Sequence, residues 1–514
     1  MAAITTDHPF LRKHQDKIAG VLSCFDRLIF RGHLPLSWAG GLEGFLFQQK
    51  VLLKDFRAYA PQAAQRIKEH VQNLVQQAGA EFRHLRRKER MEEQARRIAH
   101  DKGIREGIVC GFSQLETCRT FRCEKGAGRL RLRPDYRRCS VFYVFLIHAV
   151  LGLIHVKIQS WFPLTMQVYC NGHDFLARKL DDLGVAYALH DNAFTWIADH
   201  QAAQACADRL VKLNWPKLLG ELARRFNPLL GKELQEKDYY WVTDQAEYAT
   251  DVLFKDESAL AGWYPRLVEH AQTCFGAEDV LKFFGRKLTA SFAGEVQTWI
   301  KRRPEGVRVN HSLKSNRLKM YDKAGSVLRI ETTINDPTEF RVRRRRAVGG
   351  PLEWQPLRKG VAWLWRYAEV SRASNGRYLA ALAVVDDDSV ARQLLDRVTK
   401  PAPWKGGRKR ALQPLSPGDQ AVFLAAMRGE HRLHGFRNRD LAQHLYPTGR
   451  KDVVERRRRS ARVTRLIQLL RAHGLAAKIP RARRYRVTAK GELLMSAALK
   501  VKTQDLPKEM SQVA

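Results

Sequence analysis

The stretch VVERRRRSARVTRLIQLLRAHGLAAKIPRARRYRV, residues 453–487, combines a helical period with a dense run of arginines. Val463, Leu466, Ile467 and Leu470 recur at helical spacing and share one side of a helix predicted for 453–473. Gly474 follows at the position of a helix C-cap. Two short strands are predicted at 475–479 and 484–487, joined by a basic tip at 480–483. This stretch therefore predicts an arginine-rich helix followed by a basic hairpin.

Two further helices are predicted immediately upstream. Ser416 begins a turn and N-cap before a helix with apolar positions such as Val422 and Phe423, and Asn438 is the predicted cap of a second helix over 439–446. Three helices followed by a basic hairpin resemble winged helix-turn-helix domains, including regulators of the MarR type. The resemblance implies a helix in the major groove of duplex DNA. The DNA-binding candidates are Arg458, Arg459, Arg462, Arg465, Arg471, Arg481, Arg483 and Arg484.

The charge balance indicates a polyanionic partner. The chain has 90 Lys and Arg against 53 Asp and Glu, a formal net charge of +37. Nucleic acid would neutralise this excess, so we expect double-stranded DNA as a partner, with single-stranded DNA as a second candidate. The most apolar run, Val141–Ile154, is too short to span a bilayer and is expected to be a buried strand, so no membrane partner is expected. Residues 1–10 lack a secretory signal pattern, which predicts a cytoplasmic protein.

The fold class predicted for the chain is α+β, with an antiparallel-sheet core, flanking helices and a C-terminal winged helix-turn-helix domain. Strands are expected within 140–169 and at 185–189, with a helix at 173–183 between them. A weaker boundary is predicted at 125–134. The predicted domains are a helical, basic N-terminal region 1–125, a candidate catalytic core 126–399, a basic linker 400–415, a winged domain 416–500 and a tail 501–514. Homo-oligomer formation is left open.

The eight cysteines do not predict a disulfide framework or a zinc site. Cys110, Cys118, Cys123 and Cys139 lie close together in sequence, but the two-residue spacing of zinc ligand pairs is absent. They are expected to be reduced, buried thiols. No glycine-rich phosphate loop is present either, so no nucleotide cofactor is expected.

The segment GVRVNHSLKSNRLKMYDKAGSVLRIETTIN, residues 306–335, has the most suggestive chemistry. Alternation places Arg317, Lys319 and Tyr321 on one face of a strand. After a turn at 322–325, Arg329, Glu331 and Thr333 lie on one face of the next strand. A phenol, a carboxylate and several cations are the parts needed to transfer a DNA phosphodiester to tyrosine. The hairpin is therefore a candidate catalytic element.

The pattern Lys319-x-Tyr321-x-Lys323, followed by Leu328-Arg329-Ile330-Glu331, resembles rolling-circle replication initiators of plasmids and filamentous phages. The resemblance implies a metal-dependent DNA-nicking fold, with Tyr321 as the acceptor of the cut strand and Glu331 and Asp191 as ligands of Mg²⁺ or Mn²⁺. Lys319, Lys323 and Arg329 are the further catalytic candidates. The chain departs from the related His-hydrophobe-His pattern, because Lys157 stands where the second histidine of 155–157 would be.

A second acidic set lies in 239–254, a segment predicted to be helical. Asp244, Glu247, Tyr248 and Asp251 would share one helical face, and the three carboxylates form an alternative metal site. Tyr240 and Tyr248 are alternative nucleophiles.

Two other interpretations remain open. Asp26, Asp191 and Glu331 have the order expected of an RNase H-like transposase, whose chemistry needs converging carboxylates. The alternating, β-branched stretch 330–334 favours a strand, whereas the last acid of that fold usually lies on a helix. The other interpretation is a non-enzymatic winged-helix regulator. The favoured hypothesis is a DNA-binding protein of mobile-element type that nicks or transfers a strand.

Overall fold

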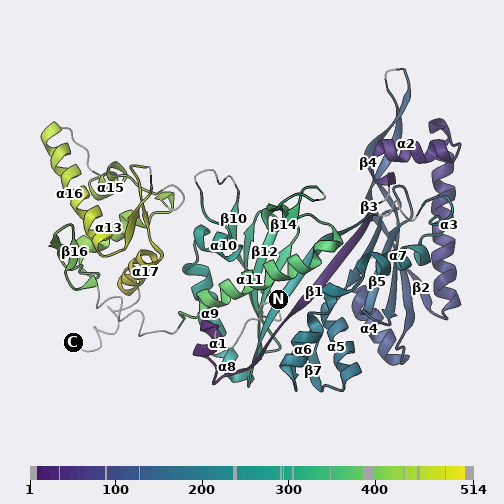
Figure 1. Ribbon diagram of the computed structural model, residues 1–514, viewed down its shortest axis with the longest axis horizontal. Helices are drawn as coiled ribbons and strands as arrows, with labels where there is room; N and C mark the ends of the chain where they lie inside the picture. The colour runs from purple at the N-terminus through teal and green to yellow at the C-terminus, as the bar shows by residue number, and fades with distance from the viewer. Residues whose placement is uncertain are drawn as a thin grey trace. The chain divides into compact units, whose positions relative to one another are not determined.

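The computed structural model describes residues 8–33, 35–86, 89–126, 128–235, 240–289, 292, 294–303, 306–347, 349–385, 398–431, 435–447, 452–480 and 482–503. The chain forms two compact units. Unit 1 comprises Met1–Thr6, His14–Ala261 and Ser315–Gly376, and unit 2 comprises Asp7–Lys13, Gly262–Lys314 and Arg377–Ala514. The predicted α+β class is confirmed, because a large, mostly antiparallel sheet with flanking helices forms the body of unit 1 (Figure 1).

The large sheet of unit 1 has the strand order β12-β13-β9-β1-β6-β5-β4-β3-β2. Neighbouring strands pair antiparallel, except that β2 and β3 run parallel. The strands are β1 (Ile18–His33), β2 (Glu81–Leu85), β3 (Gly107–Lys125), β4 (Leu130–His148), β5 (Gly152–Gln159), β6 (Met166–Cys170), β9 (Tyr240–Phe254), β12 (Asn316–Lys323) and β13 (Val327–Ile334).

Helices flank this sheet, and two small hairpins accompany it. The helices are α2 (Ala39–Gln48), α3 (Phe56–Gln77), α4 (Met91–Asp101), α5 (Gly172–Leu183), α6 (His200–Ala207), α7 (Trp215–Phe226), α8 (Glu257–Ala261) and α11 (Leu364–Leu382). The hairpins are β7 (Tyr187–His190) with β8 (Ala193–Ile197) and β14 (Arg341–Arg345) with β15 (Leu352–Pro356). Short 3₁₀ helices span Pro35–Ser37, Leu53–Asp55, Leu210–Lys212, Pro337–Glu339 and Val361–Trp363.

One face of the sheet, here called the polar face, is rich in ionisable side chains. The pairs Glu247–Arg27, Gln167–Lys157 and Glu116–Cys139 lie opposite each other across neighbouring strands, so alternation places all of them on this face. In β1 the side chains of residues 27, 29 and 31 are exposed or half-buried, whereas those of 28, 30 and 32 are buried. The alternation shows that this part of the polar face is less covered than the face behind it.

Helices α2, α3, α7 and α11 pack on the opposite face. Phe30 meets Trp215 of α7 with ring centroids 4.5 Å apart, and Asn375 of α11 donates a hydrogen bond to Thr250 of β9. On the polar face, α5 and α6 cover only the region around Leu22, Leu253 and Val327. Helix α4 packs in a cluster with Phe112 and Phe145. These helices leave the half-buried row of β1 outside their apolar clusters.

The structure corrects two expectations about unit 1. The N-terminal region 1–125 does contain helices, but β1, β2 and β3 also lie in it, and β1 is an interior strand of the sheet. The predicted helix at 239–254 is wrong, because this segment is strand β9. A four-residue spacing such as Glu247 to Asp251 fits the period of a strand as well as that of a helix. The strands predicted within 140–169 and at 185–189 and the helix at 173–183 are confirmed, with Asn171 as cap and Gly184 left-handed.

Unit 2 contains a helix pair, a hairpin and a C-terminal group of helices. Its elements are α1 (Pro9–Lys13), α9 (Tyr264–Thr273), α10 (Ala277–Phe283), β10 (Val296–Arg303), β11 (Gly306–Leu313), β16 (Ala402–Trp404), β17 (Gly407–Lys409), α13 (Pro417–Ala426), α15 (Asn438–Leu445), α16 (Val453–Ala472), β18 (Ala476–Lys478), β19 (Tyr485–Val487) and α17 (Ala489–Thr503). The three helices and the hairpin expected beyond residue 416 are therefore present. Helix α17 was not expected.

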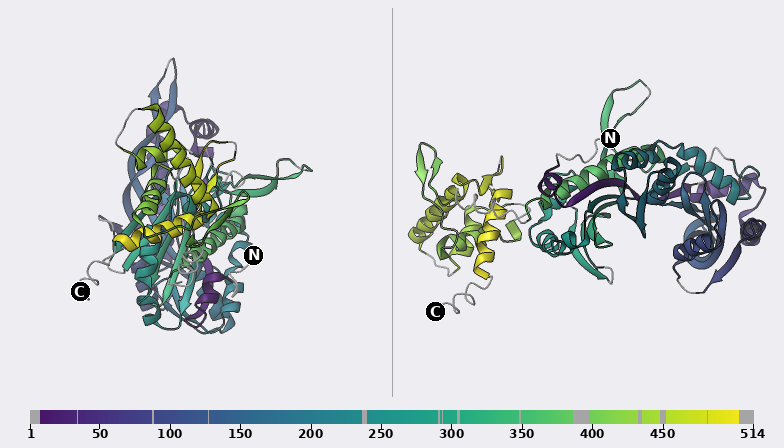
Figure 2. Two further views of the ribbon diagram at one scale, coloured as in Figure 1. Left: turned by 90° about the vertical axis from the view of Figure 1, so that its left-hand side faces the viewer. Right: turned by 90° about the horizontal axis from the view of Figure 1, so that it is seen from below.

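The C-terminal elements share one apolar core, in which Phe423 of α13, Leu441 of α15 and Ile467 of α16 are buried together (Figures 1 and 2). Ser416 caps α13, as predicted, by accepting a hydrogen bond from the backbone of Asp419. Asn438 does not cap α15; its amide donates instead to Ser460 and Thr464 of α16. Leu412, from the predicted linker, also enters this core.

Among the described residues, no helix has both the length and the apolar character needed to cross a bilayer.

The contact between α5 and β1 provides a test of this packing. A Cβ atom added to Gly172 would lie 2.1 Å from the backbone oxygen of Phe25. We expect Gly172→Ala to lower the unfolding free energy by about 1–3 kcal/mol, because backbone must move to relieve the overlap. Thermal or urea unfolding of the full chain measures this change.

The matched control is Gly220→Ala in α7, where an added Cβ meets only the Arg224 side chain at 3.9 Å. This change should stabilise the chain by up to about 1 kcal/mol, because alanine favours a helix interior over glycine. Equal unfolding free energies for the two variants would contradict the proposed packing of α5 on β1.

Candidate functional site

Three carboxylates converge on the polar face of unit 1. Asp26 of β1, Glu247 of β9 and Glu331 of β13 each place an oxygen atom within 4.8 Å of the others. Their exposed fractions are 6%, 7% and 1%. Burying three acids together is costly unless cations or protons compensate them. This acidic cluster therefore needs a specific electrostatic environment.

Strand register and one irregularity of β1 bring the three acids together. Glu331 lies opposite Ala249, one same-face position from Glu247 in β9. The pairing of β1 with β9 shifts between Phe25 and Arg27, as at a β-bulge, and Asp26 occupies this shift. A bulge re-aims a side chain relative to regular alternation. Asn192, from the turn between β7 and β8, donates a 2.7 Å hydrogen bond to Asp26.

Lys319 and Tyr321 of β12 contact this cluster from the neighbouring strand. The Lys319 ammonium hydrogen-bonds Glu331 and lies 3.1 Å from Glu247, so it bridges two of the three acids. The Tyr321 hydroxyl donates a 2.6 Å hydrogen bond to the second oxygen of Glu331. The predicted sharing of one face by Lys319, Tyr321, Arg329 and Glu331 is thus confirmed by the register of β12 with β13.

Arg329 forms a second, fully buried layer beside the acidic cluster. Its guanidinium binds Asp251 through two hydrogen bonds of 2.7 Å and also donates to the backbone oxygen of Asn192 at 2.9 Å. His173 of α5 lies 3.1 Å from the same guanidinium and 3.3 Å from Asp26. Arg329 is completely buried, and its contacts join β13, β9 and α5.

The protonation of these groups follows from burial and charge. Burial raises the pKa of Glu331 despite the nearby Lys319, and burial together with Glu331 raises that of Tyr321 well above 10. Burial also opposes ionisation of Asp26 and Asp251, but Arg329 and His173 outweigh it and lower the pKa of both acids. The pKa of His173 is raised, because Cys24, Asp251 and Asp26 outweigh its burial. Glu331 thus accepts a proton more readily than Asp26 does.

The surroundings of Asp26 fit a bound ion or water. Within the described residues, Asn192 Oδ1 is a buried acceptor without a hydrogen-bond partner beside Asp26, which suits a cation or water, whereas the unpartnered donor Arg329 Nη1 suits water only. Three carboxylates and an amide oxygen are the donors that Mg²⁺ and Mn²⁺ prefer. The cluster borders solvent at Arg27, whose side chain is 44% exposed and lies 3.8 Å from Glu247.

Other predicted residues lie elsewhere. Asp191 is not part of the acidic cluster; its carboxylate is 76% exposed and pairs with Lys323 at 3.1 Å. Asp244 pairs with Arg31 and Lys359, and Asp251 with Arg329. The alternative set Asp244, Glu247 and Asp251 therefore contributes only Glu247. Tyr248 points to the opposite face, where its hydroxyl accepts hydrogen bonds from Arg372.

The C-terminal arginines divide into two groups. Arg458, Arg462, Arg465 and Arg483 are exposed. Arg459 lies over the ring of Tyr446, Arg471 lies over Trp404 and Tyr485, and Arg484 donates to the backbone of Gly435. Arg481 lies outside the described residues. Only the exposed group is presented for contact with a ligand.

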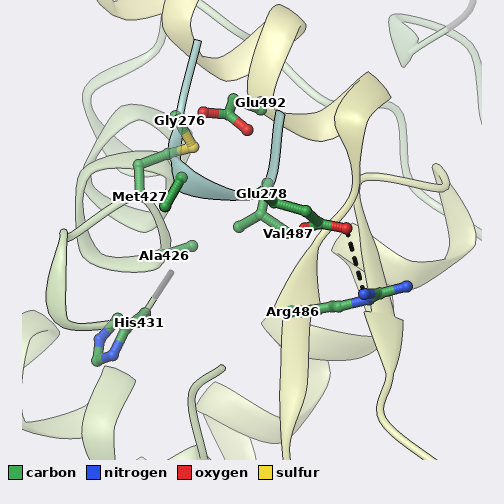
Figure 3. A pocket seen from close by; sticks show the side chains of 9 residues that line it. Gly276, Glu278, Ala426, Met427, His431, Arg486, Val487 and Glu492 are labelled. Atoms are coloured by element: carbon green, nitrogen blue, oxygen red, sulfur yellow. Dashed lines mark hydrogen bonds and ion pairs between the residues drawn. The ribbon is translucent and has the colours of Figure 1, made fainter. Parts of the chain in front are cut away.

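Other polar groups are less suited to catalysis. All eight cysteines are free, and none belongs to a potential metal group among the described residues. A pocket of unit 2 has a volume of about 40 Å³ and is closed on one side by the ion pair of Arg486 with Glu278, 3.4 Å long (Figure 3). This volume suits a few water molecules and not a nucleotide. A second potential metal group, Glu430, His431 and His444, lies in unit 2.

The buried pair of Arg329 and Asp251 predicts the effect of Asp251→Asn. Loss of the carboxylate leaves a buried guanidinium uncompensated, so we expect about 3–5 kcal/mol less unfolding free energy at pH 7. Because the pKa of Asp251 is lowered in the folded state, its contribution is present above pH 3.8 and is lost as the pH falls further. The difference between wild type and variant, measured by urea unfolding, should therefore shrink below pH 3.8.

Asp244→Asn on the same strand is the control. Asp244 is partly exposed and paired with the surface groups Arg31 and Lys359, so the expected change is below about 1 kcal/mol. A loss for Asp251→Asn no greater than for Asp244→Asn would contradict the role assigned to the buried pair.

Comparisons with protein-family models, with curated proteins and with solved structures find no match to this chain. The function of the acidic cluster is therefore inferred from its own residues and their geometry.

Proposed function

We propose that this chain is a metal-dependent enzyme of mobile-element type that nicks or transfers a DNA strand. The observation that supports this proposal is the meeting of Asp26, Glu247 and Glu331 with Lys319 and the Tyr321 hydroxyl in one buried site. These residues come from four strands and from segments about three hundred positions apart. A purely structural sheet face gains no stability from three buried acids in contact.

Asp26, Glu247 and Glu331 would hold Mg²⁺ or Mn²⁺ through oxygen ligands. Lys319 already places one positive charge between Glu247 and Glu331, which supports the proposal of a cation at this position. A bound divalent ion would supply charge stabilisation for a phosphoryl oxygen. The net positive charge of the chain would bring the phosphodiester toward this otherwise acidic site.

Tyr321 and Glu331 are arranged for nucleophilic attack. The phenol proton would pass to Glu331, whose raised pKa suits a proton acceptor, as the phenolic oxygen bonds to phosphorus. The bond from phosphorus to the leaving sugar oxygen breaks, and that oxygen takes up the proton held by Glu331 to become a hydroxyl end. Lys319 and Arg27 are placed to offset negative charge on the phosphorane. Arg329 was predicted for this role, and its contacts with Asp251 and His173 favour positioning of these two residues.

An RNase H-like transposase is the second candidate. In its favour, Asp26 and Glu331 converge, and the Tyr321 hydroxyl is buried, which leaves water as an alternative nucleophile. Asp191 does not join them, and Glu331 lies on a strand. A non-enzymatic regulator is the third candidate, and it predicts DNA binding without cleavage.

The C-terminal group of unit 2 is proposed to be a winged helix-turn-helix domain of MarR type that binds duplex DNA. Helices α15 and α16 are joined through Asn438, and the short hairpin β18–β19 follows α16. Helix α16 exposes Arg458, Arg462 and Arg465 over two turns. This arrangement supports a recognition helix with a basic wing.

The first functional test is strand cleavage by the full chain. Wild type with Mn²⁺ should convert a supercoiled plasmid with an origin or transposon-end sequence to the nicked form. Tyr321→Phe and Glu331→Gln should each lower the rate at least 100-fold, because each removes a reacting group. Tyr248→Phe changes a buried tyrosine of the opposite face and should leave the rate unchanged. Gel electrophoresis measures all four.

The product separates the candidate chemistries. Heat-stable protein attached to the cut end through Tyr321 supports tyrosine transfer, whereas a free end that forms equally well with Tyr321→Phe supports hydrolysis by water. If the wild type leaves the plasmid intact with every DNA sequence and every metal ion tested, the non-enzymatic regulator is favoured instead.

The second functional test concerns α16. Arg462→Gln should weaken binding to a duplex and reduce the slope of log K against log[salt] by about 1, as for loss of one phosphate contact. Arg428→Gln, an equally exposed change outside α16, is the control. Fluorescence anisotropy at several NaCl concentrations measures both. Identical slopes for wild type and Arg462→Gln would argue against α16 as the DNA-contacting helix.

A further inference from the structure

The strands β3 and β4 form a long two-stranded ribbon. Their antiparallel pairing continues without interruption from Cys110 opposite Phe145 to Lys125 opposite Leu130. The paired strands extend past the rest of the sheet to a tip beyond α2 (Figures 1 and 2). The weak domain boundary predicted at 125–134 falls where β3 ends at Lys125 and β4 begins at Leu130. We call residues 117–138 the ribbon arm.

The ribbon arm is strongly basic. Eight of its side chains are cations and all eight are exposed, whereas only Glu124 and Asp135 are acidic. Glu124 pairs with Arg122 at 3.1 Å and also with Arg133. The exposed cations are Arg119, Arg122, Lys125, Arg129, Arg131, Arg133, Arg137 and Arg138.

Strand register gives the ribbon arm two different faces. Arg122, opposite Arg133, shares the polar face of the sheet with Arg131 and Arg137. The other face carries Phe121 and Leu132, both buried. The backbone of Leu132 donates a 3.0 Å hydrogen bond to Glu43 of α2. Helix α2 thus supports the back of the arm, while Arg122, Arg131, Arg133 and Arg137 occupy its open side.

The arrangement of the arginines has no evident benefit for folding. Like charges directly opposite each other on an antiparallel pair are destabilising, and Arg122 faces Arg133 in this way. A single acid, Glu124, offsets both. Arg137 lies over the ring of Trp161 at 3.9 Å, a contact that fixes the base of the arm. The remaining positive charge is left for a partner.

We propose that the ribbon arm is a second DNA-contacting element, which binds duplex DNA through the arginines of its polar face. The major groove, about 12 Å wide, admits a two-stranded ribbon. Seven of the eight cations are arginines, whose planar guanidinium binds phosphate or guanine through two hydrogen bonds. The inference rests on the proposed DNA-directed function but does not require strand cleavage.

The polar face connects the ribbon arm with the acidic cluster. Next to the arm, Glu116 pairs with Lys157 of β5 at 2.8 Å. Two residues away in β5, His155 stacks on Tyr169, whose ring lies 5.8 Å from the Arg27 guanidinium. A hollow of about 210 Å³, lined by Arg31, Arg119 and Lys157 among others, lies on this route. DNA held by the arm would therefore have a polar, partly basic surface between it and the candidate catalytic site.

The test uses the full chain with a 30-base-pair duplex in EDTA, so that no metal-dependent cleavage occurs. The variant Arg131→Gln/Arg133→Gln removes two charges of the arm, and Arg97→Gln/Arg209→Gln removes two exposed charges elsewhere in unit 1. We expect the arm variant to raise the Kd about tenfold and to lower the salt slope by about 2, one unit for each phosphate contact. The control variant should match wild type. Equal melting temperatures would show that both variants fold.

An unchanged Kd and salt slope for the arm variant would overturn the proposal. So would a selective loss of binding to phosphatidylserine vesicles with DNA binding intact, because the arm would then be a membrane-contacting surface. These outcomes are independent of the cleavage assay: a weakened arm variant together with a wild type that never nicks supports the arm and rejects the enzyme. A wild type that nicks DNA, together with an arm variant that binds DNA normally, supports the enzyme and rejects the arm as a DNA-contacting element.

Discussion

The buried pair of Arg329 and Asp251 is the interaction on which the candidate site depends. It joins β13 to β9, and the same guanidinium reaches His173 of α5 and the backbone of Asn192. Because a fully buried guanidinium must satisfy its charge and its N–H groups, each of these partners is held in place. Asp26, which contacts both His173 and Asn192, is positioned by them. The acidic cluster is thus built beside a fixed cation.

The two layers differ in their electrostatics, and the difference matters for chemistry. Beside Arg329, Asp26 and Asp251 have lowered pKa values and remain ionised. Glu331 lies two residues after Arg329 on the same face of β13, near Glu247 and Lys319, and its pKa is raised. Neighbouring carboxylates with opposite shifts are typical of sites that combine cation binding with proton transfer. Tyr321 donates its hydroxyl hydrogen bond to Glu331, the carboxylate with the raised pKa.

The large sheet also carries charged side chains outside the acidic cluster. Helices cover most of one face, whereas the polar face keeps a half-buried row from Arg27 and Arg31 to Lys157 and Glu116. The ribbon arm continues this face as a row of arginines. Together with α16 in unit 2, the arm gives two separate basic surfaces, which agrees with a positive charge that is spread over the chain and not confined to its C-terminal end.

The sequence by itself determined much of the local structure and part of the site. Turn residues, caps and apolar spacing predicted α5, α13 and α16, and the alternation of 317–333 predicted that Lys319, Tyr321, Arg329 and Glu331 share a face. These features depend on neighbours within one hairpin or helix. The tertiary structure decided which acids meet. Glu247 joins Glu331 through strand pairing, Asp26 joins them through a bulge, and Asp191, Asp244 and Asp251 find other cations. Neither the register between strands distant in sequence nor the position of a bulge is encoded by a local period, since a four-residue spacing fits both β9 and a helix.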